Sequence, residues 1–352
     1  MADMNFCVYH DIGTEIHGYL VPDGFSSTPV VRVRLNGAEA TTDLPTWVYI
    51  DGARKQGFHE TGNVGFILTD ENVPGMSAAP QVELSDPISE LVFYRRAQPG
   101  QFLPKKVLRV ETSIVPHNEI DFALRPRFQF YADRAEHYGF ETVRQMLEII
   151  HQPSVYVSGR LMVKNFWTYI NYNIEVSMIS VQNPYVELAA RLAVFSRLRK
   201  SGFRFISPRD KVLFKPVVEY FDDIDIQNEQ VLNRALASAP KHILALLSSP
   251  LTQQLVGSTP SDVAGLNDIP KALDVLSQFD VFDSGNDLAS YPKLIADALA
   301  ISSDDIPMRG ASEFILKIAE TLRANSRVGH LLEADLILHH FIAKAGTRAE
   351  AS

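Results

Sequence analysis

The sequence is poor in cysteine, with Cys7 the only one among 352 residues. A single thiol cannot form an intramolecular disulfide, and a cysteine-based zinc site needs several thiolates. The chain also lacks an apolar run of about 20 residues, the length that crosses a bilayer. Its first residues show no basic segment followed by an apolar one, as a secretory signal would. We therefore expect a cytoplasmic protein without a membrane span.

Several familiar chemical motifs are absent as well. The sequence has no GxxxxGK[ST] phosphate loop, no GxGxxG after a strand, no GxSxG nucleophile elbow and no HExxH. These absences count against P-loop nucleotide hydrolases, Rossmann dinucleotide enzymes, serine hydrolases and zinc proteases. His339 and His340 are adjacent, so on a helix they point about 100° apart and are poorly placed to share a metal. We predict no metal site.

Negative charge dominates the chain, but unevenly. The net charge is −9, whereas residues 105–215 carry 17 Lys and Arg against 10 Asp and Glu, a net charge of +7. A small anionic ligand, such as a nucleotide or a phosphosugar, suits this basic third better than a long polyanion does. The acidic whole argues against nucleic-acid binding.

Residues 1–96 show the pattern of an antiparallel β domain. Val31 and Val33 alternate with arginines, as expected for a half-buried strand. Asn-Gly and Asp-Gly pairs separate short apolar runs, which is typical of a sandwich or barrel. Residues 97–105, rich in proline and glycine, are the expected linker. We predict a small β-sandwich with strands at Asn5–His10, Glu15–Val21, Val30–Leu35, Asn63–Thr69, Gln81–Leu84 and Glu90–Arg96.

Residues 106–347 change to an α/β pattern. Helical segments, among them one expected over Arg127–His137, alternate with short apolar strands. Such alternation predicts a mainly parallel, doubly wound sheet with flanking helices, because each crossover lays a helix on the sheet. The expected strands begin near Val107, Val155, Val176 and Phe279.

The stretch Ser154–Lys200 carries the sharpest candidate site. A strand reaches Ser158, Gly159 permits a tight turn, and Arg160 is expected in the first turn of the next helix. Lys164 follows four residues later, on the same helix face. A helix N-terminus with Arg and Lys side chains attracts anions. These residues are the predicted site for an anionic donor; the alternative interpretation is a solvated helix face.

Two other strand ends offer candidate contacts. Thr112 and Ser113 end the first strand of the α/β domain, where hydroxyls bind phosphate or sulfate. His117 follows them and is a candidate general base. Asn183 precedes a proline, which predicts a helix N-cap, and it is also a candidate ligand contact. Arg191, in the helix that follows, is interpreted as a surface charge.

Three segments of the α/β domain carry a family resemblance: SMISVQNPYVELAARL, LSQFDVFDSGNDLASYPKLIADAL and LLEADLILHHFIAKA. The first is similar to the strand, Arg-Asp-Pro turn and helix of the P-loop sulfotransferase superfamily, the second to its late strand and helix, and the third to its final helix. Gln182 and Asn183 stand where the family has Arg and Asp. The resemblance is to sulfotransferase-like proteins of bacterial surface-polysaccharide clusters in particular.

The resemblance implies a transferase that moves a group from a nucleotide-type donor, of the 3′-phosphoadenosine kind, to a sugar acceptor in polysaccharide assembly. In this hypothesis His117 activates the acceptor hydroxyl. The donor would contact Thr112, Ser113, Ser158, Gly159, Arg160, Lys164 and Asn183.

Two alternatives come from other classes. The exchanged Gln182 and Asn183 favour a non-catalytic glycan-binding or scaffold protein. The acidic run 222–225 offers metal-ligating carboxylates, as a nucleotide-sugar glycosyltransferase would need. All three hypotheses share a small-molecule or glycan ligand, and each is compatible with a homo-oligomer.

Overall fold

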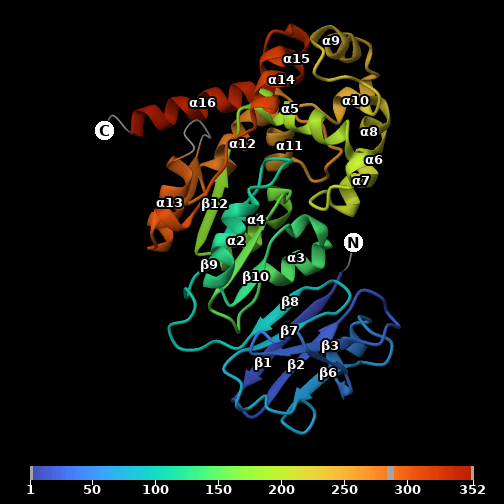
Figure 1. The fold of residues 1–352 in the computed structure, drawn as a ribbon, viewed down its shortest axis with the longest axis vertical. Coiled ribbons are helices and arrows are strands. Elements are labelled where there is room, and N and C mark those ends of the chain that lie inside the picture. The colour runs from blue at the N-terminus through green and yellow to red at the C-terminus, as the bar shows by residue number, and fades with distance from the viewer. Residues whose placement is uncertain (1–2, 284–288, 350–352) are drawn as a thin grey trace. The chain divides into compact units, whose positions relative to one another are not determined.

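The computed structural model describes residues 3–283 and 289–349 of the chain (Figure 1). The chain forms two compact units: the first holds Met1–Leu108, Leu124–Ser158 and Tyr169–Glu175, and the second holds Arg109–Ala123, Gly159–Thr168 and Val176–Ser352. Residues 284–288, inside the segment compared with the family's late strand and helix, lie outside the described residues. Among the helices described, none combines the length and the apolar character needed to cross a membrane.

The first unit contains two four-stranded antiparallel sheets. Their strand orders are β1-β2-β6-β5 and β4-β3-β7-β8. The predicted antiparallel β region is confirmed, and β4 and β5 have no counterpart among the predicted strands. The bounds are β1 Asn5–Asp11, β2 Ile16–Val21, β3 Val30–Leu35, β4 Thr41–Pro45, β5 Val48–Tyr49, β6 Asn63–Leu68, β7 Val82–Ser85 and β8 Val92–Arg95.

Side-chain alternation defines β3 but not its neighbour β4. Val31 and Val33 of β3 are buried, whereas β4 is almost wholly exposed. The two strands pair antiparallel from Val30 to Arg34, and Arg32 adds two hydrogen bonds to Asp43 across the pair, at 2.8 and 2.7 Å. An edge strand held in this way has no apolar pattern by which a sequence search could find it.

Phenylalanine rings from both antiparallel sheets meet in the core of the first unit. The ring of Phe93 (β8) lies 5.7 Å from that of Phe6 (β1) and 6.3 Å from that of Phe66 (β6). Phe130, in the short strand β10 (Phe130–Ala132), stacks on Phe6 at 5.9 Å. All four rings are buried, and each contributes about 1.5–3 kcal/mol through loss of apolar surface.

A five-stranded parallel sheet follows, with the order β10-β11-β9-β12-β13. It confirms the predicted parallel sheet, but the helix predicted over Arg127–His137 is wrong, because β10 lies there. Phe130, Tyr131 and Ala132 are all buried, and periodicity cannot distinguish a strand from a helix in so short an apolar run. The other bounds are β9 Lys106–Val110, β11 Val155–Gly159, β12 Val176–Ser180 and β13 Val281–Asp283.

The strand order creates a topological switch point between β9 and β12. After β9 the chain leaves toward β10 on one side, and after β12 it leaves toward β13 on the other. In open α/β sheets, ligands bind in the crevice outside the carboxyl ends of two such strands. The two loops are adjacent here, since the Thr112 hydroxyl donates to the Ser180 carbonyl at 2.6 Å.

Helix α5 (Pro184–Phe195) is central to the helical core of the second unit. Leu188, Leu192 and Phe195 are fully buried, and the core continues through α8, α9 and α14 (Figure 1). The remaining helices are α1 Asp51–Lys55, α2 Asn118–Leu124, α3 Phe140–Leu147, α4 Val163–Asn173, α6 Leu198–Ser201, α7 Pro208–Leu213, α8 Lys215–Phe221, α9 Glu229–Ser238, α10 Lys241–Ala245, α11 Pro250–Val256, α12 Ile269–Leu276, α13 Ser290–Leu299, α14 Glu313–Arg323, α15 Ser326–Leu331 and α16 Glu333–Ala349.

Candidate functional site

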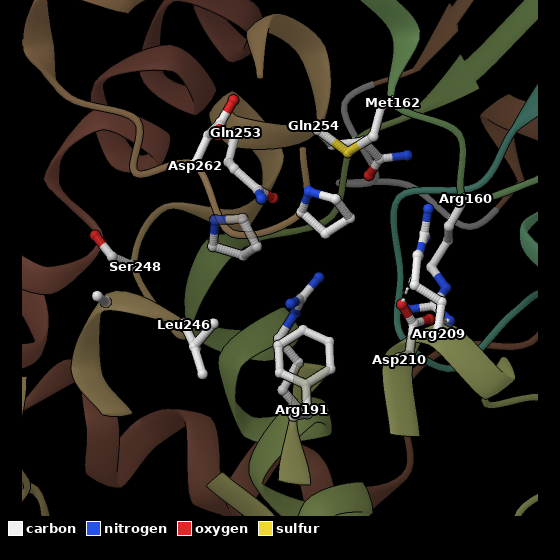
Figure 2. Close-up of a pocket in the computed structure, with 14 residues that line it drawn as sticks. Arg160, Met162, Arg191, Arg209, Asp210, Leu246, Ser248, Gln253, Gln254 and Asp262 are labelled. Atoms are coloured by element: carbon white, nitrogen blue, oxygen red, sulfur yellow. Dashed lines mark hydrogen bonds and ion pairs between the residues drawn. The ribbon is translucent and has the colours of Figure 1, made fainter. Parts of the chain in front are cut away.

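Three arginines line a small cavity in the second unit, which we call the arginine cavity (Figure 2). Arg160 lies in the loop after β11, Arg191 on α5 and Arg209 on α7. The cavity volume is about 40 Å³, room for a few water molecules or one small oxyanion. Guanidinium groups bind phosphate and sulfate through charge-assisted hydrogen bonds. The cavity therefore suits an anion.

Arg191 is the central group of the arginine cavity. Its side chain reaches into the middle of the cavity in Figure 2, although the residue is only 7% exposed. Its Nε donates to Glu187, one helical turn earlier, at 2.6 Å. Its two terminal nitrogens make no hydrogen bond to any residue that the structure describes. Arg191 lines the cavity, and an anion there would accept charge-assisted hydrogen bonds from these nitrogens.

Asp210 holds the other two arginines. Arg160 Nη2 donates to Asp210 Oδ2 at 2.6 Å, and Arg209 Nε donates to Oδ1 at 3.3 Å. Burial opposes ionisation of Asp210, but the attraction of Arg160 and Arg209 outweighs it and lowers the pKa of this carboxyl. With Asp262 at the same cavity, two carboxylates face three arginines. The lining therefore keeps an excess of one positive charge.

Glu187 lies behind Arg191 and connects α5 to the loop after β9. Besides Arg191 Nε, it accepts from Ser113 Oγ and from the Ile114 backbone nitrogen, both at 3.0 Å. Burial raises the pKa of Glu187, against the opposing effect of Arg191. The loop after β9 thus holds the Glu187 carboxyl in place, and that carboxyl holds Arg191.

The predicted anion site after β11 is only partly assembled. Arg160 lines the arginine cavity, but α4 begins at Val163, so the expectation that Arg160 occupies the first helical turn is wrong. Lys164 is exposed and donates to the Ser258 hydroxyl at 2.7 Å instead of lining the cavity. Gly159 ends β11 with a φ of 154°, a backbone conformation that favours glycine.

Hydroxyl groups at the predicted strand ends point into the protein. The Thr112 and Ser113 hydroxyls are buried and donate to Ser180 and Glu187, respectively. Ser158 is fully buried, and its Oγ has no hydrogen-bond partner among the described residues. In the structure as described, Thr112 and Ser113 therefore support the loop and Glu187.

His117 belongs to a buried network with Arg109, Glu111 and Asp121. Arg109 donates to Asp121 at 2.8 Å and to Glu111 at 3.0 Å, and His117 Nδ1 lies 3.2 Å from Glu111 Oε2. Burial disfavours the charged imidazole, but the nearby Glu111 outweighs burial and raises the pKa of His117. The Glu111 carboxylate at Nδ1 orients the imidazole and makes it more basic, and the opposite nitrogen, Nε2, lies near Gln182.

Asn183 and Gln182 have different roles at the end of β12. Asn183 is the N-cap of α5, as predicted, because its side chain accepts from the Tyr185 backbone nitrogen at 3.0 Å. Gln182 and His117 line a second cavity of about 430 Å³, which we call the His117 cavity. This volume is in the range of small-molecule sites. Helix α5 contributes to both cavities.

Sequence reasoning missed most of the arginine cavity. Arg191 is buried, so its interpretation as a surface charge is wrong. A signal was present, because Glu187 and Arg191 are spaced i,i+4 in an otherwise apolar helix, the arrangement of a buried ion pair. Arg209 and Asp210 gave no local signal: Asp210 meets Arg160 across 50 residues of sequence.

Comparison with known proteins gives no relative, since no protein-family model, no curated protein and no solved structure matches the chain. Among the described residues, no group of three or more His, Cys, Asp or Glu side chains is arranged to hold a metal ion. A function must therefore be argued from the two cavities and their surroundings.

Proposed function

We propose that the chain is a sulfotransferase-like transferase whose arginine cavity binds the anionic group of a nucleotide-type donor. The donor is of the 3′-phosphoadenosine kind, and the acceptor is a sugar of a bacterial surface polysaccharide. The proposal includes a doubly wound arrangement for the parallel sheet, a sandwich for the antiparallel sheets and a cytoplasmic location. Because the cavity admits only a small group, the rest of the donor lies outside it.

The observation that carries the proposal is the buried Arg191 with its terminal nitrogens directed into the arginine cavity. Each hydrogen bond from a charged donor to an oxyanion is worth about 1.5–3 kcal/mol. Arg160 and Arg209, which line the same cavity, add positive charge. Group transfer from an anionic donor depends on such positioning and neutralisation of charge.

The transfer step requires a base as well as an anion site. A bond forms between the acceptor oxygen and the transferred group, the bond to the donor breaks, and the acceptor proton must move to a base. Asp210 has a lowered pKa, which makes it a weak base, and His117 lines the second cavity and not the arginine cavity. These two observations favour a second candidate function, a non-catalytic relative that binds the same anionic ligand.

A thermal-shift panel tests the proposal. The panel holds adenosine 3′,5′-bisphosphate, the phosphosulfate donor, inorganic phosphate, and nucleotide-sugars with and without a divalent metal. A ligand at about 100 times its dissociation constant stabilises the folded state by about 2.7 kcal/mol. Wild type is compared with Arg209→Gln and with Arg234→Gln, a matched change at an exposed arginine of α9 that does not line the cavity.

We expect the bisphosphate to stabilise wild type and Arg234→Gln more than Arg209→Gln. Transfer of sulfate from the phosphosulfate donor to a sugar would then identify the transferase, and binding without transfer to any acceptor would identify the non-catalytic relative. A shift that requires both a nucleotide-sugar and a metal would contradict the proposal and indicate a glycosyltransferase. Absence of any shift would refute both candidate functions.

A further inference from the structure

The His117 cavity has a different chemistry from the arginine cavity. Its wall is apolar and aromatic, and it comes from α5, from the segment after α6 and from α14. The wall includes Val186, Ala190, Val194, Phe203, Phe205 and Phe314. A ligand with many hydroxyls would find few hydrogen-bond partners on such a surface, whereas a hydrocarbon or aromatic group would bury apolar area there.

Two side-chain nitrogens meet at the polar end of this cavity. His117 Nε2 lies 3.5 Å from the amide nitrogen of Gln182, while the opposite ring nitrogen, Nδ1, faces the Glu111 carboxylate. His117 is only 6% exposed. When His117 is protonated, its Nε2 can only donate, and so can the amide nitrogen. In that protonation state neither group satisfies the other, and both residues line the cavity.

Positive charge is also present on the cavity lining. Arg197 and Arg309 line the cavity, with the Arg197 guanidinium 4.6 Å from the Phe314 ring centroid. Glu119 is the only carboxylate among the described lining residues, and its Oε1 accepts from the Arg309 backbone nitrogen at 2.9 Å. With His117 protonated, three cations therefore face one carboxylate. An oxygen anion bound here would meet a net positive surface.

We propose that the His117 cavity binds an apolar organic anion. Its hydrocarbon or aromatic body packs on the wall formed by α5 and α14, and one oxygen of its carboxylate or sulfonate accepts from both His117 Nε2 and Gln182 Nε2. The site is at the switch point between β9 and β12, where open α/β sheets bind ligands. This inference does not rest on the proposed function, because it concerns the other cavity.

Calorimetric titration of the full-length protein with decanoate, decanol and naphthalene-2-sulfonate tests this site. Decanol has the same chain as decanoate without the charge, so the pair isolates the contribution of the anion. One charge-assisted hydrogen bond corresponds to about a tenfold to hundredfold change in affinity. We expect decanoate and the sulfonate to bind, and decanol to bind at least about tenfold more weakly.

Gln182→Glu places a carboxylate where the ligand's anion is expected. Because Gln182 is half-buried, the variant should remain folded, and it should lose anion affinity by about tenfold or more. Gln230→Glu, the same change at an exposed glutamine of α9 that does not line the cavity, should bind like wild type. Equal binding by Gln182→Glu and Gln230→Glu, or equal affinity for decanoate and decanol, would overturn the proposal.

The pH dependence of binding gives an independent readout. The sulfonate keeps its charge throughout, so its affinity should fall as the pH rises and His117 loses its proton. The groups that face His117 are Glu111 and Arg109 of the buried network, Glu119 of α2 and the neutral Gln182. A flat affinity between pH 6 and pH 10, or no binding at any of these values, would also overturn the proposal.

Discussion

Changing Arg191 should lower the free energy of unfolding by a large amount that depends on Glu187. Arg191→Gln removes the only cation among the described residues that forms an ion pair with the buried Glu187 carboxyl; the pair is 2.6 Å long, and its side chains are 8% and 7% exposed. Breaking one side of such a pair costs about 3–5 kcal/mol. Burial already raises the pKa of Glu187, so protonation of the orphaned carboxyl limits the cost at low pH. We expect a larger loss at pH 8 than at pH 5.

The double variant Glu187→Gln/Arg191→Gln should recover most of this loss. It removes both charges. The amide oxygen that remains can accept from Ser113 Oγ and from the Ile114 backbone nitrogen, which donate to Glu187 in the wild-type protein. Urea unfolding of wild type, both single variants and the double variant at pH 5 and pH 8 gives the coupling energy. Arg234→Gln, at an exposed position, should stay within about 0.5 kcal/mol of wild type. A double variant as unstable as the sum of the single variants would refute a coupled buried pair.

Three further predictions concern single elements. Asn183→Ala removes the N-cap of α5 and should lower the free energy of unfolding by about 1 kcal/mol, whereas Asn183→Ser should retain most of it in the same urea assay. Glu111 raises the pKa of His117, so the interaction between the two should stabilise the folded state fully below about pH 6.5. That stabilisation should be lost as the pH rises through the folded-state pKa of His117. A His117→Gln variant whose melting temperature depends on pH as wild type does would contradict this. Gly18→Ala should destabilise the first unit by about 1–3 kcal/mol, because the added Cβ would lie 2.5 Å from the Cys7 carbonyl oxygen; a melting temperature equal to wild type would show that β1 and β2 adjust freely.

The fold was predictable where an element carries a clear apolar pattern. Strand β3 alternates buried valines with arginines, and β11 and β12 are wholly buried runs bounded by turns and helices. Strand β4 was not predictable, because it is exposed and is defined by its antiparallel pairing with β3. Strand β10 was mistaken for helix because its three buried residues carry no period, and only pairing with β11 decides their structure.

The candidate site was predictable only in part, because tertiary packing assembles it. Arg160 follows a strand and was found from that position, but its partner Asp210 is distant in the sequence. The role of His117 depends on Glu111, six residues earlier, and on the burial of both side chains. Burial and the nearby carboxylate together decide the direction in which the pKa of His117 moves, and the sequence around His117 does not specify the burial.

The most direct test of the central claim is calorimetric titration of adenosine 3′,5′-bisphosphate and inorganic phosphate into wild type and the double variant Glu187→Gln/Arg191→Gln. The comparison is made at a pH where both proteins are folded. We predict that the bisphosphate binds wild type and that the double variant binds it at least about tenfold more weakly, since charge-assisted hydrogen bonds from Arg191 are lost. Equal affinity for both proteins, or no binding to wild type, would contradict the claim that the arginine cavity receives the anionic group of a ligand.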